Sequence, residues 1–261
     1  MLRGIYASAT GMVAQARRLD VLANNLANAA TVGYKRDVTI AATFQDLLQE
    51  RLDDRVPPAP GTTRAVGPVP AGTAVATATR LADGPIKATG RPLDVALQGD
   101  GFFTILTPEG IRYTRAGNFD QDGQGRLVTA AGHPVLVSGR PVAGRSIVIR
   151  ENGEVWVDGL LAGTLDIVTT DQVGPLRKVG DNLWAPGGPG APLVGGASTA
   201  TGQNPARPWR LLVGFLEMSN VEPIREMVEL IHATRTFEAN QKALQAQDQA
   251  LGRAVNDLVG R

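Results

Sequence analysis

The chain has 261 residues, of which 43% are hydrophobic and 20% charged, and its formal net charge is +1. This composition is ordinary for a folded protein, and a charge so close to zero gives no global field that would draw the chain to nucleic acid or to an anionic membrane. There are no cysteines, which excludes disulfides, thiol catalysis and cysteine-bound metals. No stretch approaches the roughly 18–20 apolar residues of a membrane-spanning helix.

The first thirty residues have the spacing of a long helix with two apolar faces. One stripe steps alternately by three and four residues through Leu2, Ile5, Ala9, Met12, Ala16, Leu19, Ala23, Leu26 and Ala30. A second stripe, Ala7, Gly11, Ala14 and Val21, lies roughly opposite. We therefore expect a helix from about Arg3 to Ala30, with Gly33 as the left-handed residue past its end. Such a helix is either buried in a large core or packed against several helices, some of them from other chains.

Three asparagines lie near the end of this predicted helix, at positions 24, 25 and 28. Asparagine is a mediocre helix former because its amide competes for backbone groups. The run has two interpretations from its chemistry alone. It is either a fraying last turn or a set of side chains that bond to a specific partner within or between subunits.

The next segment predicts a short second helix and then a linker. Asp37 to Asp54 places Phe44, Leu47, Leu48 and Leu52 on one side of a helix. The sequence Val56-Pro57-Pro58-Ala59-Pro60-Gly61 then ends any regular element. From there to about Ala76 we expect an extended linker or an irregular strand.

From about Val75 to Phe215 the pattern changes from helix to strand. Short apolar runs are separated by turn signals such as Pro108-Glu109-Gly110 and Asn152-Gly153 about every ten residues. This spacing predicts an antiparallel all-β domain instead of alternating βαβ units. The expected strands cover 93–97, 101–106, 111–115, 127–129, 134–137, 146–149, 155–157 and 163–168. We expect Pro186 to Pro205, which is rich in Gly and Pro, to form a long surface loop.

The C-terminal segment predicts a second long helix. Ser219-Asn220-Val221-Glu222 has the form of a capping box, and Pro223 is tolerated in a first helical turn. A heptad-like seam follows at Met227, Leu230, Thr234, Phe237, Gln241, Leu244, Asp248, Leu251, Val255 and Leu258. A second stripe includes Ile224, Val228 and Ile231, so this helix also has two apolar faces.

The fold class that these patterns predict is α+β. The N- and C-terminal helices form a coiled-coil-like helical domain, parallel or antiparallel, and a central, mostly antiparallel all-β domain lies between them in sequence. The expected divisions are 1–45 and 216–261 for the two halves of the helical domain, 46–80 for the linker or extension, and 81–215 for the β domain. The second helix faces predict assembly with other chains. The alternative is a closed intramolecular hairpin in which alanine is simply a good helix former.

Five motifs, in order along nearly the whole chain, resemble those of bacterial flagellar axial proteins. Residues 24–36, NNLANAATVGYKR, resemble the N-terminal motif of rod, hook and hook-associated proteins. Residues 91–103 and 113–119 resemble the start and the next hairpin of the β domain in rod and hook proteins. Residues 216–221 and 235–242 resemble the C-terminal motif. The length of the chain and its single β region are similar to those of the flagellar basal-body rod proteins of the hook-basal body family, proximal or distal.

The resemblance implies a structural subunit that polymerises helically into the hollow drive shaft, which transmits torque to the hook and filament. A hook or hook-associated adaptor protein of the same family is the alternative. Implied partners are the chain itself, other axial proteins and the flagellar type III export apparatus, with no nucleic acid, small-molecule substrate or membrane insertion. The implied location is the basal body in the cell envelope. Export without a cleaved signal is expected because Arg17, Arg18 and Asp20 interrupt the apolar residues of the N-terminus.

The predicted subunit interface lies in the helical core and combines residues of both terminal helices. Its members are Ile5, Ala9, Met12, Ala16, Leu19, Ala23, Asn24, Asn25, Leu26, Asn28, Met227, Leu230, Phe237, Leu244, Leu251, Val255 and Leu258.

No catalytic, cofactor or metal site is predicted. The segment from Asp120 to Gly125 resembles a calcium loop, but Ala131 stands where the twelfth, acidic ligand belongs, so a hairpin turn is favoured. His133 and His232 have no partner at metal-ligand or triad spacing. The acids that an enzyme in the β domain would need have no spacing that enforces pairing; they are Asp94, Asp100, Asp120 and Asp122. The basic residues Arg17, Arg18, Lys35 and Arg36 are expected to lie on a solvated face or to pair with Glu222, Glu226 and Glu229.

Overall fold

The computed structural model describes residues 2–43, 73–173, 176–186 and 209–259 of the chain. Its contacts divide the chain into two compact units. The first, here called the helical unit, contains Met1–Ala27, Arg36–Arg80 and Glu222–Arg261. The second, the β unit, contains Asn28–Lys35 and Leu81–Val221. The fold is therefore α+β, as the sequence predicts.

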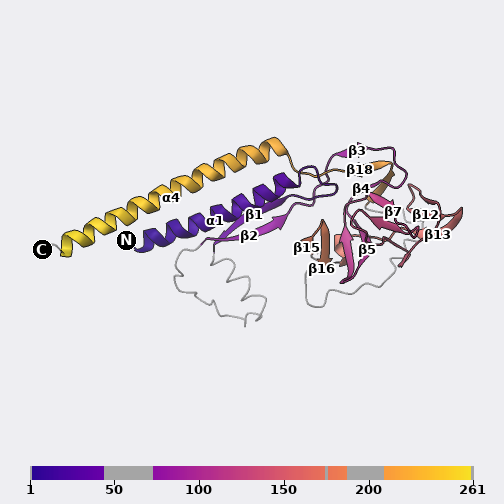
Figure 1. Ribbon diagram of the computed structural model, residues 1–261, viewed down its shortest axis with the longest axis horizontal. Coiled ribbons are helices and arrows are strands. Elements are labelled where there is room, and N and C mark those ends of the chain that lie inside the picture. The colour runs from indigo at the N-terminus through magenta and orange to yellow at the C-terminus, as the bar shows by residue number, and fades with distance from the viewer. Residues whose placement is uncertain (1, 44–72, 174–175, 187–208, 260–261) are drawn as a thin grey trace, which may run out of the picture. The chain divides into compact units, whose positions relative to one another are not determined.

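The helical unit is built on two long helices, α1 (Leu2–Ala27) and α4 (Pro223–Val259). They lie side by side with the N- and C-termini at the same end (Figure 1). Their contacts show that they run antiparallel, because Gly11 faces Asn240 whereas Arg18 pairs with Glu229, so residue numbers rise along α1 as they fall along α4. Among the described helices, none contains an 18-residue stretch apolar enough to lie across a bilayer.

A pair of strands completes the helical unit, where the sequence predicted the start of a short helix. Strands β1 (Asp37–Thr43) and β2 (Thr73–Thr79) pair antiparallel over their full length. The helical prediction from Asp37 was therefore wrong over β1, because β-branched residues dominate there and strand pairing with a distant segment satisfies the backbone. The rest of that predicted helix, with Phe44, Leu47, Leu48 and Leu52, lies outside the described residues.

Both helix ends differ from the prediction by about one turn. Helix α1 ends at Ala27 instead of Ala30, and Gly33 follows with φ of +67°, in the left-handed region that was expected of it. Helix α4 begins at Pro223, which is a good first helical residue because its missing N–H would have no intrahelical partner. The Ser219 hydroxyl accepts a hydrogen bond from Val221 N at 3.3 Å, so the capping box is not formed.

The β unit contains sixteen of the described strands, and every pairing between them is antiparallel. They are β3 (Ile86–Ala88), β4 (Val95–Gly99), β5 (Phe102–Thr107), β6 (Gly110–Thr114), β7 (Phe119–Gln121), β8 (Leu127–Thr129), β9 (Leu136–Val137), β10 (Arg140–Pro141), β11 (Ile147–Ile149), β12 (Glu154–Val157), β13 (Leu160–Thr164), β14 (Ile167–Val168), β15 (Leu176–Gly180), β16 (Leu183–Pro186), β17 (Trp209–Val213) and β18 (Phe215–Glu217). A short helix, α3 (Thr170–Val173), follows β14.

The strands form one five-stranded sheet, one three-stranded sheet and several pairs. The larger sheet has the order β14-β5-β6-β16-β15, and the smaller has the order β11-β12-β13. The local hairpins β5–β6 and β7–β8 fall where the turn signals predicted them. The pairs β17–β4 and β18–β3 instead join segments more than a hundred residues apart. The predicted loop 186–205 lies outside the described residues, apart from Pro186 at the end of β16.

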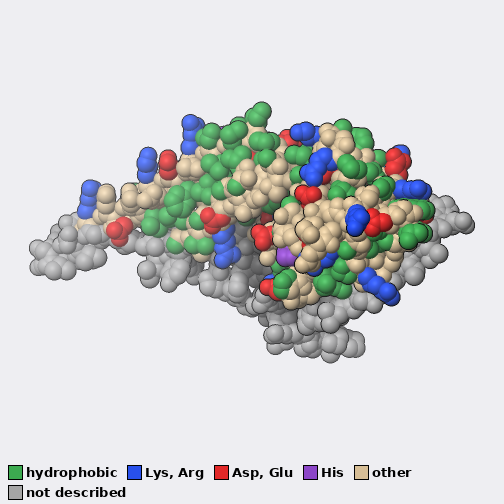
Figure 2. Space-filling model, turned by 45° about the vertical axis from the view of Figure 1, so that its right-hand side comes forward, with side chains coloured by type: hydrophobic (Ala, Val, Ile, Leu, Met, Phe, Trp, Pro, Cys, Tyr) green, Lys and Arg blue, Asp and Glu red, His purple; other side chains and the backbone are tan. Residues whose placement is uncertain are grey.

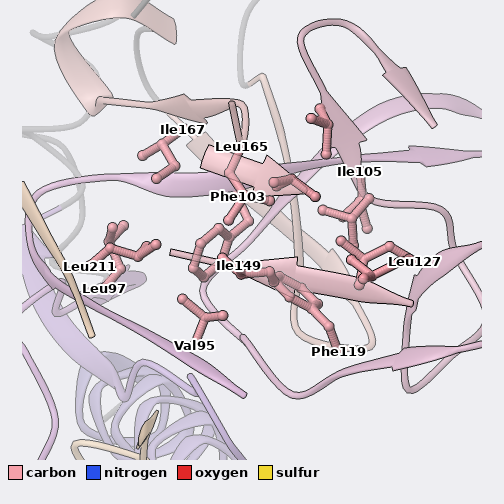
Figure 3. Close-up of a cluster of buried hydrophobic side chains, with 14 residues drawn as sticks. Val95, Leu97, Phe103, Ile105, Phe119, Leu127, Ile149, Leu165, Ile167 and Leu211 are labelled. Carbon is pink, nitrogen blue, oxygen red and sulfur yellow. The ribbon is translucent and has the colours of Figure 1, made fainter. Parts of the chain in front are cut away.

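The core of the β unit is a cluster of fourteen buried side chains contributed by most of its strands (Figure 3). The rings of Phe103 and Phe119 meet edge to face, with centroids 5.2 Å apart. Successive residues of a strand point to opposite faces, so Phe102 enters a second cluster with Tyr113 and Trp184. Because the five-stranded sheet is covered on both faces around β5, this strand is a nearly continuous apolar run.

Candidate assembly surface

An apolar stripe on the first two turns of α4 is the most exposed cluster of large apolar residues among the helical-unit side chains that the structure describes. Ile224, Met227, Val228 and Ile231 are between 44% and 77% exposed. Their spacing of three and four residues places them on one face, opposite Glu226 and Ala233, which are buried. Hydrophobic side chains gather over this part of the molecule in Figure 2. We call this set the α4 stripe.

The predicted α1 residues divide into two groups according to their exposure. Met12, Ala16, Leu19 and Leu26 are half-buried, whereas Ala9 and Ala23 are exposed. Val13, which was in neither predicted stripe, is 57% exposed. Helix α1 thus also presents an outer face, and small residues line part of it.

On α4, the predicted seam is only partly covered. Leu230, Phe237 and Leu244 are half-buried, but Met227 is 44% exposed and belongs to the α4 stripe. The side chains of Ile5, Leu251, Val255 and Leu258 lie outside the described set, although their backbones are helical. Sequence reasoning missed Leu22 and Ala233, which are buried in the helical unit although neither stripe included them.

Asn25 is fully buried within a single chain, and its amide bonds to both β1 and α4. Its Oδ1 accepts a hydrogen bond from Asp37 N at 2.9 Å, and its Nδ2 donates to Asp37 O at 2.8 Å. Nδ2 also lies 3.3 Å from Glu226 Oε2. Asn25 therefore joins α1, β1 and α4, and it offers no surface to a second chain. Of its neighbours, Asn24 is exposed, and Asn28, which belongs to the β unit, accepts a hydrogen bond from Thr31 Oγ1 at 3.2 Å.

Two ion pairs join the helical unit, and both were among the pairings considered from the sequence. Arg18 pairs with Glu229, and Arg36 Nη1 lies 3.3 Å from Glu226 Oε1. They line a cleft of about 410 Å³ between α1, β1 and the start of α4. The remaining lining is mixed, with Gln15 and Arg225 beside apolar Val21 and Leu22.

The chemistry of the acidic turns agrees with a structural role for them. The Asp122 carboxylate accepts hydrogen bonds from Arg126 N, Arg126 Nε and Gln124 N, and these bonds lower its pKa from the ordinary value. Asp120 pairs with Arg91 at 3.6 Å, and Asp94 is buried. Within the described residues, no group of three or more His, Asp or Glu side chains is placed to hold a metal ion. His232 is exposed on α4, and His133 follows the β7–β8 hairpin.

Comparison with known proteins places the chain in a family. Residues 5–35 match the family described as "Flagella basal body rod protein", residues 96–157 match "Flagellar hook protein FlgE/F/G D1 domain", and residues 212–258 match "Flagellar basal body rod FlgEFG protein C-terminal". The chain is 36% identical to the flagellar basal-body rod protein FlgG of Borreliella burgdorferi, with 98% of each chain covered. The chain belongs to the flagellar basal-body rod protein family.

Other relatives extend the same match. FlgG of Bacillus subtilis is 35% identical over 98% of this chain and 99% of its own length. The basal-body rod protein FlgF of Caulobacter vibrioides is 30% identical, with 94% of this chain and 93% of the relative covered. The family is one of structural rod proteins, and membership in it confirms the resemblance that the five motifs indicated.

Proposed function

We propose that this protein is a structural subunit of the flagellar basal-body rod. In this role, copies of the chain stack helically with one another and with other axial proteins into a hollow shaft that transmits torque to the hook and filament. Family membership over nearly the full chain carries the proposal. A hook or hook-associated role is less favoured, because the full-length relatives described above are named as rod proteins.

The α4 stripe supports assembly through the helical unit. Its residues turn away from α1, so the single chain leaves them in water, and each fully buried aliphatic side chain would contribute about 1.5–3 kcal/mol to association. The outer face of α1, with Ala9, Val13 and Ala23, is a second and different surface. A contact between two different surfaces generates a helical filament when its rotation does not close into a ring. We propose that α1 and α4 form a coiled-coil-like pair within this assembly.

The remaining interface residues predicted from the sequence stay in the proposal where the chain leaves them accessible. These are Ala9, Ala23, Asn24 and Met227, together with the half-buried members of both helices. Asn25 is removed from the set because its amide is used within the chain. We propose that the subunit acts without catalysing a reaction and without a cofactor. We also propose that it reaches the basal body through the flagellar type III export apparatus.

The deciding experiment is electron cryotomography of basal bodies in cells from which the gene for this protein has been deleted. We expect a shaft that stops short inside the envelope, with no hook beyond it, and restoration by the wild-type gene. Shafts of full length in the deletion strain would overturn the rod proposal. Shafts of full length that lack only the hook would instead support the hook or hook-associated alternative.

A further inference from the structure

Three of the sequence motifs meet at one buried carboxylate in the β unit. Glu217, from β18, has a 1% exposed side chain and lies between two cations. Its Oε1 is 2.6 Å from Lys35 Nζ, and its Oε2 is 2.6 Å from Arg115 Nε. The cations are 2% and 3% exposed. Asp83 completes the group, with Oδ1 at 2.9 Å from Arg115 Nη2. We call these four residues the ionic clasp.

The clasp satisfies backbone groups as well as charges. Arg115 donates to Leu97 O at 2.8 Å and Gly99 O at 2.6 Å, and it also donates to Gly101 O, so its guanidinium holds the turn between β4 and β5. Lys35 Nζ donates to Ala82 O at 2.9 Å. Glu217 Oε1 accepts a further hydrogen bond from Gly84 N at 2.9 Å. A buried charge is tolerated when its remaining donors and acceptors are hydrogen-bonded, and these bonds meet that requirement.

In the segment before Lys35, each residue from Val32 to Tyr34 makes a specific contact within the β unit. Asn182 Nδ2 donates to Val32 O at 2.6 Å, and the Lys178 ammonium lies 4.2 Å from the centre of the Tyr34 ring. Gly33 packs so closely that a Cβ there would lie 2.5 Å from Ala116 N, which, with its positive φ, requires glycine. The part of the N-terminal motif from Asn28 to Lys35 is therefore built into the β unit.

The clasp joins all the segments through which the chain passes between its two units. The chain changes unit at 27/28, 35/36, 80/81 and 221/222. The first two crossings bound the loop that ends at Lys35, and the third is followed directly by Ala82 and Asp83. The fourth follows Glu217. Backbone bonds link its segment to the loop before Lys35, from Gly33 N to Glu217 O at 2.8 Å and from Asn220 N to Tyr34 O at 3.3 Å, and Met218 N to Pro85 O at 2.9 Å links it to the segment after the third crossing.

We propose that the ionic clasp makes the segments at these four crossings, here called the attachments, open and close together in one cooperative step. A force that enters the β unit through any one crossing is then shared by all of them. The reason is electrostatic. Withdrawing the segment of Lys35 or of Glu217 leaves an opposite buried charge uncompensated, which is far less favourable than losing an exposed pair. Asp83 is 43% exposed, so the segment that carries it is held mainly through Ala82 O and Gly84 N, which bond to the buried charges. Partial opening is therefore suppressed. The sharing of load rests on the proposed rod function, whereas the joint opening can be measured on the isolated protein.

The test is native-state hydrogen exchange of the full chain, comparing wild type with Glu217→Gln. Four amides report the attachments: Gly33, Gly84, Met218 and Asn220, each bonded across the clasp or beside it. In wild type we expect all four to exchange through one opening, with a common opening free energy after each rate is corrected for the intrinsic rate of its amide. In Glu217→Gln we expect at least tenfold faster exchange with a different opening free energy at each site, while the core amide of Val135 stays unchanged.

The matched control is Glu109→Gln, which neutralises the exposed ion pair with Arg112 and should leave all four amides at wild-type rates. If Glu217→Gln does not fold, Lys35→Met serves instead, with the largest acceleration expected at Gly33. Unchanged rates at the four amides, or equal acceleration of these amides and Val135, would overturn the clasp. A failure of the rod proposal is seen separately, as full-length shafts in the deletion strain.

Discussion

Phe103 in the β unit and Val228 in the helical unit are large apolar side chains in well-formed elements, yet the first is fully buried and the second is 49% exposed. The contrast extends to their surroundings. Phe103 belongs to a fourteen-residue core, whereas the neighbours of Val228 along its stripe, Ile224 and Ile231, are exposed too. The β unit thus buries a large apolar core by itself, although single side chains such as Leu160 and Leu161 remain exposed on it. In the helical unit the exposed apolar residues of α4 instead follow one helix face, which suits a surface that other chains cover.

The sharpest way to break this comparison is Phe103→Ala. We expect the β unit to lose about 3–5 kcal/mol, the usual loss for a large aromatic side chain deleted from a packed core. All three tryptophans, Trp156, Trp184 and Trp209, lie in the β unit, so urea unfolding followed by their fluorescence reports this unit alone. Val148→Ala, at a 47% exposed position, should change the same free energy by less than about 1 kcal/mol. Equal losses of unfolding free energy from the two substitutions would mean that the buried core is not the main source of the stability of the β unit.

The helical unit should be most sensitive at its polar contact, so the next prediction concerns Asn25→Ala. The substitution leaves Asp37 N and O and the buried Glu226 without the amide, and we expect a loss of about 1–3 kcal/mol. Circular dichroism at 222 nm during thermal unfolding measures it, because both long helices are in this unit. The exposed α1 position Asp20→Ala should stay within about 0.5 kcal/mol. An unchanged unfolding transition in Asn25→Ala would mean that the bonds of the Asn25 amide do not stabilise the helical unit, as expected of a fraying helix end.

The sequence was most informative where structure depends on neighbours along the chain. The hairpin β5–β6 was predicted because turn residues separate two apolar runs. For β7–β8 the turn and the second strand were predicted, but β7 was not among the expected strands. The pairing of β1 with β2 was missed because its second strand lies thirty residues later, beyond a proline-rich stretch. Periodicity located the α4 stripe but could not show which helix face the partner covers. Exposed Met227 was accordingly placed in the same seam as half-buried Leu230.

The charged residues also show that contacts between distant segments are harder to predict than local ones. Arg18 and Arg36 pair with the α4 acids that were considered for them. Lys35, adjacent in sequence, instead enters the β unit and meets Glu217, 182 residues away. Lys35 and Arg36 are adjacent basic residues, and no local feature predicts different partners for them. The chain passes from the β unit to the helical unit at the peptide bond between them, so each side chain finds its partner in a different unit. The buried pairing therefore follows from the fold and could not be read from spacing.

The pH dependence of the β unit provides a smaller and more specific prediction. Burial lowers the pKa of Lys35 from its ordinary 10.5, although Glu217 and Asp83 oppose the shift and Arg115 adds to it. Between the lowered pKa and 10.5, the unfolded chain holds a proton that the folded chain has released. The unfolding free energy should therefore rise with pH through this window. Burial raises the pKa of Tyr113, which acts in the opposite direction above pH 10.

The measurement is urea unfolding of wild type and Lys35→Met between pH 8 and pH 10, followed by tryptophan fluorescence. Because Tyr113 is present in both proteins, the difference between them isolates Lys35. We expect the stability of wild type relative to Lys35→Met to increase with pH. A constant difference would show that the lysine titrates alike in the folded and unfolded chains, and a decreasing one would show that Glu217 outweighs desolvation.

The smallest effect on the folded monomer is expected from Val228→Asp, which should have the largest effect on assembly. An aspartate on the exposed α4 stripe should change the unfolding free energy by less than about 0.5 kcal/mol, because the side chain remains in water. In an assembled shaft the same carboxylate would be buried without a partner, and we expect shafts to be absent from cells that carry the variant. Val148→Asp places the same charge at a matched exposure in the β unit, and we expect it to assemble. Normal shafts with Val228→Asp would show that the α4 stripe stays in water after assembly. Loss of shafts with both variants would mean that assembly also depends on the β unit, and the division between a self-contained unit and one completed by its neighbours would no longer hold.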